Sequence, residues 1–328
     1  MSIYEEIKTI NKQFAFEPKI ENLGNLKKLS KFIIVGMGGS HLAGNIFQMI
    51  RPELDIIIHK NYGLPKLSKE NLQERLIILS SYSGNTEEVL EGYKEAIGMG
   101  LNMAVISVKG KLLEMAKKDN IPYIEMLDIK IGGNSIEPRS ALALSLKSFS
   151  KLIGDEDMEN EIKKLAENFD TKNFEEQGKN LSEIIYKKIP IIYTSEENYP
   201  IAYIWKIKFN ENSKIPAFCN TFPELNHNEM SGFDVHDSTK ELSEKFHFIF
   251  LHNETDHPKI QKRMDITKKL YEDRGLKTHT IEIPSGNIYH KVFSILTVAD
   301  FASHFLAQKY DLDSKRILMI EEFKDLIK

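Results

Sequence analysis

Residues 32–40 read Phe-Ile-Ile-Val-Gly-Met-Gly-Gly-Ser, an apolar, β-branched run followed at once by a glycine-rich turn. A short run of this kind is typical of a strand buried on both faces, and the glycines allow a sharp turn into a helix that we expect over 40–51. The free N–H groups and the positive dipole end at the start of such a helix suit an anion such as phosphate. The stretch therefore predicts an α/β fold with an anion-binding turn.

This turn alone leaves other interpretations open. A dinucleotide site of the G-x-G-x-x-G kind needs a third glycine at position 41, where this chain has His41. A tight turn that holds no ligand is a further alternative. The neighbouring sequence decides between them.

The same alternation of strands and helices continues outward from this stretch. In the first half we expect strands at 32–35, 54–58, 76–79 and 103–108, with helices at 40–51, 86–99 and 111–118. In the second half we expect strands at 189–194, 246–251 and 278–283, with helices at 200–212, 259–275, 292–310 and 314–328. Strands joined by helices imply right-handed crossovers and parallel sheets. The sequence thus predicts two α/β domains, residues 1–153 and residues 154–328, with a charged surface helix and linker over 154–180 and a final C-terminal helix.

Composition excludes several classes of protein. The 328 residues carry 44 Lys+Arg against 48 Asp+Glu, a net charge of −4, so bulk charge does not attract nucleic acid. No apolar run reaches the length of a membrane span, and the first residues do not resemble a signal peptide, so we expect a cytoplasmic protein without a membrane partner. The one cysteine, Cys219, excludes an intramolecular disulfide. We expect no metal site, because His247, His252 and His257 have a spacing that neither a helix face nor a strand face brings together.

A second turn, rich in hydroxyl groups, follows the strand at 76–79. It reads Ser80-Ser-Tyr-Ser-Gly-Asn-Thr-Glu-Glu88. Ser81, Ser83 and Thr86 are able to face one anion, while Gly84 permits the sharp turn. The alternative is a helix cap, with Ser83 or Asn85 capping and an acid reaching back, but a cap does not need three hydroxyls. Two such turns at the carboxyl ends of neighbouring strands predict a phosphate site made of Gly38, Gly39, Ser40, Ser81, Ser83 and Thr86.

The two turns together resemble the sugar isomerase (SIS) domain. The whole chain resembles the bifunctional phosphoglucose/phosphomannose isomerase family of that superfamily, and five segments outside the first turn carry this resemblance. These segments are Ser-Tyr-Ser-Gly-Asn-Thr-Glu-Glu (81–88), Glu-Pro-Arg-Ser-Ala (137–141), Asn-Glu-Asn-Ser-Lys (210–214), Phe-Pro-Glu-Leu-Asn-His-Asn-Glu (222–229) and Ile-Glu-Glu-Phe-Lys (320–324).

The resemblance implies an enzyme of the intramolecular oxidoreductase class. It would interconvert glucose 6-phosphate, and with it mannose 6-phosphate, with fructose 6-phosphate through a cis-enediol, without a cofactor, in glycolysis and gluconeogenesis. Such chemistry needs a base, a ring-opening group and a positive charge near the developing oxyanion. The family assigns Glu211 as the base, His227 and Lys324 to ring opening, and Arg139 to the enediolate. It also implies a homodimer in which His227 reaches the partner's site.

Some points stay open in the sequence. Glu224 and Glu229 lie in the same segment as His227 and are rivals for the role of base. Relatives usually carry a hydroxyl seven residues before the lysine, where this chain has Ile317, so we expect the mannose activity to be restricted. Glu137 replaces a second proline and would place a carboxylate beside Arg139. A non-catalytic sugar-phosphate-binding regulator, or an isomerase of another phosphosugar, remains the alternative function.

Overall fold

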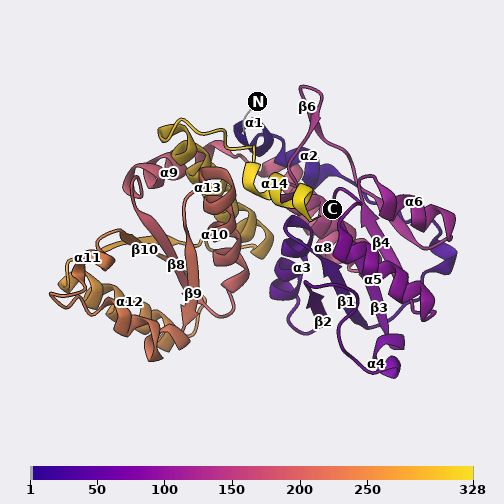
Figure 1. Ribbon diagram of the computed structural model, residues 1–328, viewed down its shortest axis with the longest axis horizontal. Helices are drawn as coiled ribbons and strands as arrows, with labels where there is room; N and C mark the ends of the chain where they lie inside the picture. Colours follow the sequence, from indigo (N-terminus) through magenta and orange to yellow (C-terminus); the bar gives the residue numbers. More distant parts are fainter. Residues whose placement is uncertain (1–2, 328) are drawn as a thin grey trace. The chain divides into compact units, whose positions relative to one another are not determined.

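The computed structural model describes residues 3–327 and divides into two compact units (Figure 1). We call residues 8–169 the N-terminal unit, and residues 3–7 together with 170–327 the C-terminal unit. The predicted boundary between residues 153 and 154 falls between two helices of the N-terminal unit, α7 (Leu142–Ile153) and α8 (Glu156–Asn168). As a boundary between domains it stays a prediction.

The N-terminal unit is built on a five-stranded parallel sheet in the order β2-β1-β3-β4-β5. Its strands are β1 (Lys31–Gly36), β2 (Asp55–His59), β3 (Arg75–Ser80), β4 (Met103–Ser107) and β5 (Tyr123–Glu125). The chain leaves β1 to form β2 on one side and then β3 on the other, so the strand order reverses between β1 and β3. In open α/β sheets, this reversal point at the carboxyl ends of the strands is where ligands bind.

Helices cover both faces of this sheet. The helices are α2 (Ile10–Ala15), α3 (Gly39–Ile50), α4 (Lys69–Gln73), α5 (Glu87–Gly98), α6 (Lys111–Lys118), α7 and α8, with 3₁₀ turns η1 (Leu23–Asn25) and η2 (Pro138–Ser140) and a small hairpin of β6 (Lys130–Ile131) and β7 (Asn134–Ser135). Buried residues of α5 and α6 pack against Ile33, Ile77 and Val105 of the sheet. On the other face α3 packs closely, since a Cβ at Gly44 would lie 3.2 Å from Ile34.

The C-terminal unit has a four-stranded parallel sheet in the order β11-β10-β8-β9. Its strands are β8 (Ile189–Ser195), β9 (Phe218–Phe222), β10 (Phe246–His252) and β11 (Lys277–Glu282). Its helices are α1 (Ile3–Ile7), α9 (Lys172–Ile184), α10 (Tyr199–Ser213), α11 (Lys240–Ser243), α12 (Pro258–Asp273), α13 (Ile288–Lys309) and α14 (Leu318–Leu326), with 3₁₀ turns η3 (Glu224–His227) and η4 (Glu229–Phe233).

Two layers of helices enclose this second sheet as well. On one face α12 contributes Met264 and Tyr271 to a cluster with Tyr193, Phe248 and Phe250 of the strands. On the other face α10 and α13 pack together, where the buried Trp205 donates a hydrogen bond to the backbone oxygen of Ile295 at 3.1 Å. Both units are therefore three-layer α/β structures with parallel sheets, and the predicted fold class is confirmed.

Most of the predicted helices and strands are confirmed, with ends that differ by up to four residues. Several elements of the structure were not predicted. β9 reads Phe-Cys-Asn-Thr-Phe and β5 has only three residues, so neither contains the apolar run on which a strand prediction depends. The C-terminal helix begins at Leu318, not at Ser314 as predicted, and Lys328 lies outside the described residues.

The charged segment at 154–180 is more than the predicted surface helix and linker. It forms two helices with buried anchors, Met158, Ile162 and Leu165 on α8 and Phe174 and Leu181 on α9. α9 lies so close to α13 that a Cβ at Gly178 would come within 2.4 Å of the Cβ of Phe301. A few apolar residues at helical spacing are thus enough to anchor a segment whose composition is charged.

Candidate active site

The first predicted phosphate turn joins β1 to α3. Gly38 is the N-cap residue of α3, with φ +52°, a conformation that favours glycine, and no side chain caps this helix start. The Ser40 hydroxyl is buried and accepts a hydrogen bond from the backbone N–H of Tyr82 at 3.1 Å. This bond ties the first turn to the second one, so the two turns act as one structural piece.

The second turn joins β3 to α5 and is held by its own hydroxyl groups. The Ser81 hydroxyl is hydrogen-bonded to the Thr86 hydroxyl at 2.8 Å and accepts from the N–H of Gly84 at 3.1 Å. The Ser83 hydroxyl accepts from the N–H of Asn85 at 3.3 Å, and the N-cap residue of α5 is Thr86, without a side-chain cap bond. The alternative of a cap made by Ser83 or Asn85 is therefore wrong.

Burial separates the roles of these hydroxyls. Ser81 is 1% exposed and helps to shape the turn, whereas Ser83 is exposed and Thr86 half-buried. Gly84 has φ +69°, and a Cβ there would lie 1.7 Å from the backbone oxygen of Lys109, so this position requires glycine. The two uncapped helix starts and the reachable hydroxyls stand at the point where the strand order reverses, which is suited to an anion.

Arg139 lies beside the first turn. Its backbone N would be 2.9 Å, and the Pro138 oxygen 2.6 Å, from a Cβ at Gly39, so the absence of a side chain at Gly39 lets η2 rest against the start of α3. The Arg139 side chain is 3% exposed and donates to a Glu137 carboxylate oxygen at 3.1 Å. The predicted carboxylate beside Arg139 is therefore confirmed, and the guanidinium has a fixed position.

His41 is a residue of this region that sequence reasoning used only to argue against a dinucleotide site. It follows Ser40 on α3 and is 4% exposed. Burial, followed by the charge of Lys60, lowers the pKa of His41 to about 4. The imidazole behind the turn is therefore neutral near pH 7 and adds no positive charge to the turn. A histidine directly after a glycine-rich turn was the available signal.

In the C-terminal unit, Glu211 is half-buried near the end of α10. Its neighbours in the Asn-Glu-Asn-Ser-Lys segment fix the helix end. Asn212 donates to the Ser303 hydroxyl at 2.9 Å, the Ser213 hydroxyl donates to the Ser303 backbone oxygen at 2.7 Å, and Asn210 donates to the Ile215 oxygen at 2.9 Å. These bonds to α13 and to the following loop hold the position of the Glu211 backbone.

His227 ends η3 and its side chain is exposed. The loop that carries it is anchored on both sides of this residue. Asn226 donates to the Thr267 hydroxyl at 2.8 Å, and Glu229 accepts from the Tyr193 hydroxyl and from the Asn220 side chain, both at 2.6 Å. The geometry thus presents His227 outward on a rigid loop.

The two rival carboxylates in this loop have structural partners. Both oxygens of Glu229 accept hydrogen bonds, from the buried Tyr193 and from Asn220. Glu224 accepts from the Asn228 side chain at 2.7 Å. Through these bonds Glu224 and Glu229 hold the loop in place. This structural role favours Glu211 over them as the base.

Glu211 and His227 lie near opposite ends of the strands of one sheet. α10 leaves the carboxyl end of β8, runs back, and connects through residues 214–217 to the start of β9, where Phe218 pairs with Ile191. His227 follows the end of β9, where Phe222 pairs with Ser195 at the carboxyl end of β8. The structure therefore does not bring these two predicted residues together within the C-terminal unit.

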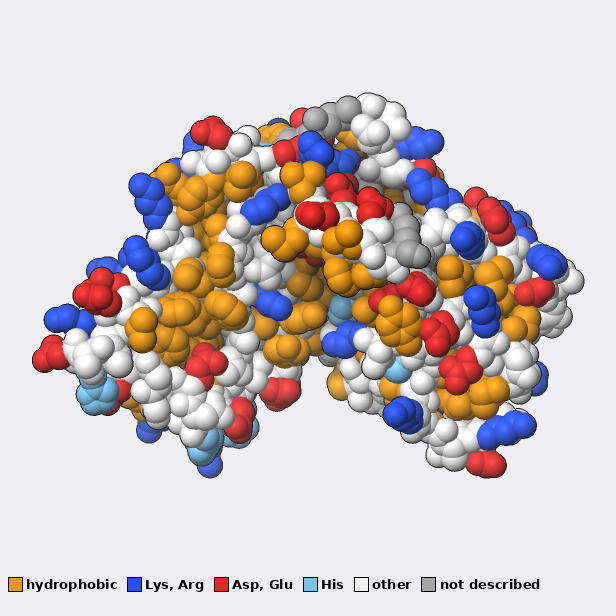
Figure 2. Space-filling model, viewed as in Figure 1, with side chains coloured by type: hydrophobic (Ala, Val, Ile, Leu, Met, Phe, Trp, Pro, Cys, Tyr) orange, Lys and Arg blue, Asp and Glu red, His pale blue; other side chains and the backbone are white. Residues whose placement is uncertain are grey.

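Lys324 lies on α14, whose residues are exposed along its whole described length. Leu318, Met319, Phe323 and Leu326 are each more than half exposed on this helix. Figure 2 shows hydrophobic side chains beside acidic ones at the place of α14 in Figure 1. Ile317 is the N-cap residue of α14 and makes no side-chain cap bond.

Residues 3–327 contain neither a membrane-spanning helix nor a cluster of metal ligands. No helix there has both the length and the hydropathy that crossing a membrane requires. No group of three or more histidine, cysteine or acidic side chains in the same part of the chain is arranged to hold a metal ion.

Comparisons with known proteins place this arrangement in a family. A model described as the bacterial phospho-glucose isomerase C-terminal SIS domain matches residues 174–327. The bifunctional phosphoglucose/phosphomannose isomerase of Aquifex aeolicus is 31% identical over 99% of this chain and 98% of its own length. That of Caldicellulosiruptor bescii is 32% identical over 99% of this chain and 97% of its own length. The chain belongs to the bifunctional phosphoglucose/phosphomannose isomerase family.

A solved structure supports the fold over the whole length. The C-terminal domain of glucosamine-fructose-6-phosphate aminotransferase from Francisella tularensis superposes with a TM-score of 0.69 at 15% identity and covers 96% of each chain. The full-length relatives confirm the predicted resemblance to this isomerase family, and with it the isomerase class of the enzyme.

Proposed function

We propose that this protein is an aldose–ketose isomerase that interconverts glucose 6-phosphate and fructose 6-phosphate through a cis-enediol. The observation that carries the proposal is the pair of linked, uncapped turns at the reversal point of the N-terminal sheet, in a chain of this family. Relatives that share the full length of the chain are named for phosphoglucose and phosphomannose isomerisation.

In this proposal the turns hold the phosphate group of the sugar. Ser40, Ser83 and Thr86 offer hydroxyl groups, and the starts of α3 and α5 offer backbone N–H groups. Gly38 and Gly39 let the backbone approach, and Ser81 keeps the second turn in shape. Neutral donors of this kind bind a phosphomonoester without a lysine.

The isomerisation moves one proton between C1 and C2. Glu211 removes the proton from one carbon and returns it to the other, while the electron pair passes through the enediolate. Arg139, held by Glu137, faces the negative charge that develops on the oxygen. His227 and Lys324 exchange the protons that open the sugar ring. This route uses proton transfers alone and requires no cofactor.

The proposal includes a homodimer with shared sites. Since Glu211 and His227 lie near opposite ends of the strands of one sheet, a single C-terminal unit does not present both to one sugar. A second copy supplies the missing residue, so His227 of one protomer serves the site that contains Glu211 of the other. The outward His227 and the exposed apolar side chains of α14 support this assembly.

The predicted location and pathway belong to the same proposal. We place the enzyme in the cytoplasm, in glycolysis and gluconeogenesis, where hexose phosphates are interconverted. The single cysteine, which cannot form an intramolecular disulfide, supports a reducing compartment.

The proposal is tested by product analysis. The purified protein, treated with a chelator, is incubated with fructose 6-phosphate, and glucose 6-phosphate and mannose 6-phosphate are quantified in one chromatographic run. We expect glucose 6-phosphate, with mannose 6-phosphate as a minor product or none, because Ile317 offers no hydroxyl. Equal amounts of both products would contradict the role given to Ile317. Ligand binding without any product would contradict the isomerase and favour a sugar-phosphate-binding regulator.

A further inference from the structure

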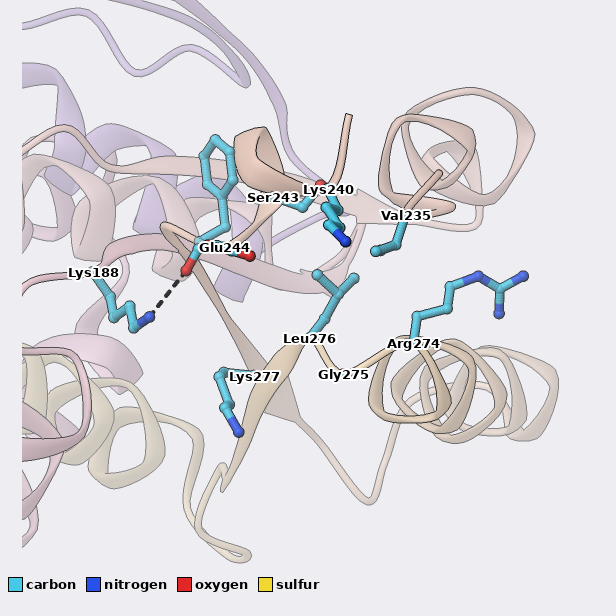
Figure 3. A pocket seen from close by; sticks show the side chains of 10 residues that line it. Lys188, Val235, Lys240, Ser243, Glu244, Arg274, Gly275, Leu276 and Lys277 are labelled. Carbon is cyan, nitrogen blue, oxygen red and sulfur yellow. Dashed lines mark hydrogen bonds between the residues drawn. The ribbon is translucent and has the colours of Figure 1, made fainter. Parts of the chain in front are cut away.

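A surface cavity of about 370 Å³ lies at the amino-end edge of the C-terminal sheet. Its walls come from the first residues of β10 and β11, from the residue that precedes β8, and from the α11 region (Figure 3). The predicted phosphate turns lie in the other unit, at the carboxyl ends of β1 and β3. None of the residues that line the cavity is among the site residues assigned above, so an inference from it does not rest on the proposed function.

Cationic side chains dominate the cavity. Lys188, Lys240, Arg274 and Lys277 line it, against one carboxylate, that of Glu244. Arg274 is neutralised by Asp234 at 2.6 Å, and Lys240 lies 3.7 Å from Asp237. Lys188 donates to the backbone oxygen of Glu244 at 2.9 Å, which leaves its charge unpaired. Within residues 3–327 the ammonium group of Lys277 has neither an ion pair nor a hydrogen bond.

The two unpaired ammonium groups flank one strand. β8 and β11 lie on either side of β10, with Ile189 opposite Phe246 and Lys277 opposite His247. Two strand spacings separate the backbones of Lys188 and Lys277 by about 10 Å. Two lysine side chains are long enough to reach one small anion across this distance. Figure 3 shows both side chains on the side of the cavity that faces away from Arg274.

A third polar group faces the same cavity. Ser243 lines the cavity and is 4% exposed. Its hydroxyl makes no hydrogen bond with any other described residue. A hydroxyl in so buried a residue normally has a hydrogen-bond partner. A ligand in the cavity is able to supply that partner.

The neighbouring His247 lies within reach of the positive charges of Lys188 and Lys277. It is 5% exposed and neither of its ring nitrogens has a hydrogen-bond partner in the described chain. Burial, and then the charges of His279, Lys188 and Lys277, lower its pKa to about 4. The two lysines thus act on His247 as positive charges at this edge of the sheet.

We propose that this cavity binds a small phosphate monoester with an apolar part, its phosphate held by Lys188, Lys277 and the Ser243 hydroxyl, its apolar part resting on Val235, Phe246 and Leu276. A phosphate monoester carries about −1.5 to −2 charges near pH 7, which matches two ammonium groups better than a carboxylate does. The volume lies within the range of about 300–1,000 Å³ that is typical of small-molecule sites.

Phenyl phosphate is a suitable probe, titrated calorimetrically into the full-length protein at low salt. The protein is first brought to equilibrium with saturating fructose 6-phosphate, so that the proposed substrate site is occupied. We expect one equivalent of phenyl phosphate to bind per chain, more tightly than inorganic phosphate, and phenol not to bind. Binding of inorganic phosphate as tight as that of phenyl phosphate would overturn the assignment of an ester with an apolar part.

Matched variants locate the binding. In Lys188→Met/Lys277→Met we expect at least about a tenfold loss of phenyl phosphate affinity. The control Lys268→Met/Lys269→Met removes two lysines from α12 that pair with Glu272 and Asp273, and its affinity should stay within about twofold. Thermal unfolding verifies that both variants fold. Unchanged affinity in the first variant would refute the site.

Discussion

At the scale of single residues, glycines and hydroxyls define the N-terminal site. The sequence predicted which positions form the turns, because Gly38, Gly39, Ser40 and Ser81 follow strands that their apolar composition reveals. It did not predict that Ser81 serves the turn itself through its bond to Thr86. The direction of a hydroxyl depends on side-chain rotamers in the folded chain, and no spacing in the sequence determines these.

Gly39→Ala tests the contact between the first turn and Arg139. The added Cβ would meet the Pro138 oxygen at 2.6 Å and the Arg139 nitrogen at 2.9 Å, so η2 must move away. We expect kcat/KM for fructose 6-phosphate to fall about 10- to 100-fold, since a small displacement of a positioned group has effects of this size. Gly24→Ala, where a Cβ meets no atom within 4 Å, is the control and should leave kcat/KM unchanged. Equal effects of both substitutions would contradict the contact.

Glu229→Gln tests the anchor of the His227 loop. An amide in place of the carboxylate turns an NH₂ group toward either the Tyr193 hydroxyl or the Asn220 side chain, and both of these are donors in the native structure. We expect the free energy of unfolding to fall by about 1–3 kcal/mol, measured by urea denaturation. Glu224→Gln keeps an oxygen to accept from Asn228 and should change it by less than about 0.5 kcal/mol. A similar stability of the two variants would exclude the anchoring role.

At the scale of elements, the strands that the sequence predicted are those with continuous β-branched runs. β1 and β3 were predicted in this way and β10 from its aromatic and aliphatic residues, whereas β9 was missed because Asn220 and Thr221 interrupt it. The parallel pairing of β9 with β8 supplies the stability that its own composition lacks. Similarly, α13 begins at Ile288, one turn earlier than predicted, because the Asn287 side chain caps it.

The buried His247 on β10 predicts a dependence of stability on pH. Burial and its neighbours lower its folded pKa from 6.5 to about 4. Between these pH values the unfolded chain binds more protons than the folded chain at this position. The free energy of unfolding therefore decreases as the pH falls from 6.5 toward 4. A shift of this size corresponds to a loss of about 3 kcal/mol.

His247→Leu isolates this contribution. His41, whose pKa is also lowered to about 4, remains in the variant, so some dependence on pH persists. We expect the loss between pH 6.5 and pH 4 to be smaller than in the wild type by about 3 kcal/mol, from urea denaturation at each pH. His236→Gln, with an exposed side chain, should retain the full loss. A His247→Leu curve parallel to that of the wild type would contradict a neutral buried imidazole.

At the scale of the whole molecule, the connection from β8 through α10 to β9 places Glu211 and His227 near opposite ends of the strands of one sheet. The resemblance to the family implied a site shared by two copies, but composition and spacing did not, because β9 was not predicted. Once β9 is known to pair with β8, the topology of one unit is enough to separate the two residues.

Mixing two inactive variants tests the shared site. Glu211→Gln and His227→Ala are combined in equal amounts and exchanged by mild dissociation. Half of the dimers are then mixed, and each of these has one site with both native residues, so we expect about a quarter of wild-type activity to return. Each variant alone, treated in the same way, is the control. If the mixture stays as inactive as its components, Glu211 and His227 act within one protomer.

The most direct test of the proposed isomerase is the rate of glucose 6-phosphate formation from fructose 6-phosphate by Glu211→Gln, compared with the wild type. Gln keeps the size of the side chain but cannot accept the C1/C2 proton, so kcat should fall by about 10²- to 10⁴-fold while the phosphate turns stay intact. Glu224→Gln, which removes the charge of the rival carboxylate, should retain kcat within about threefold. Wild-type turnover in Glu211→Gln, or loss of turnover in Glu224→Gln alone, would contradict Glu211 as the base.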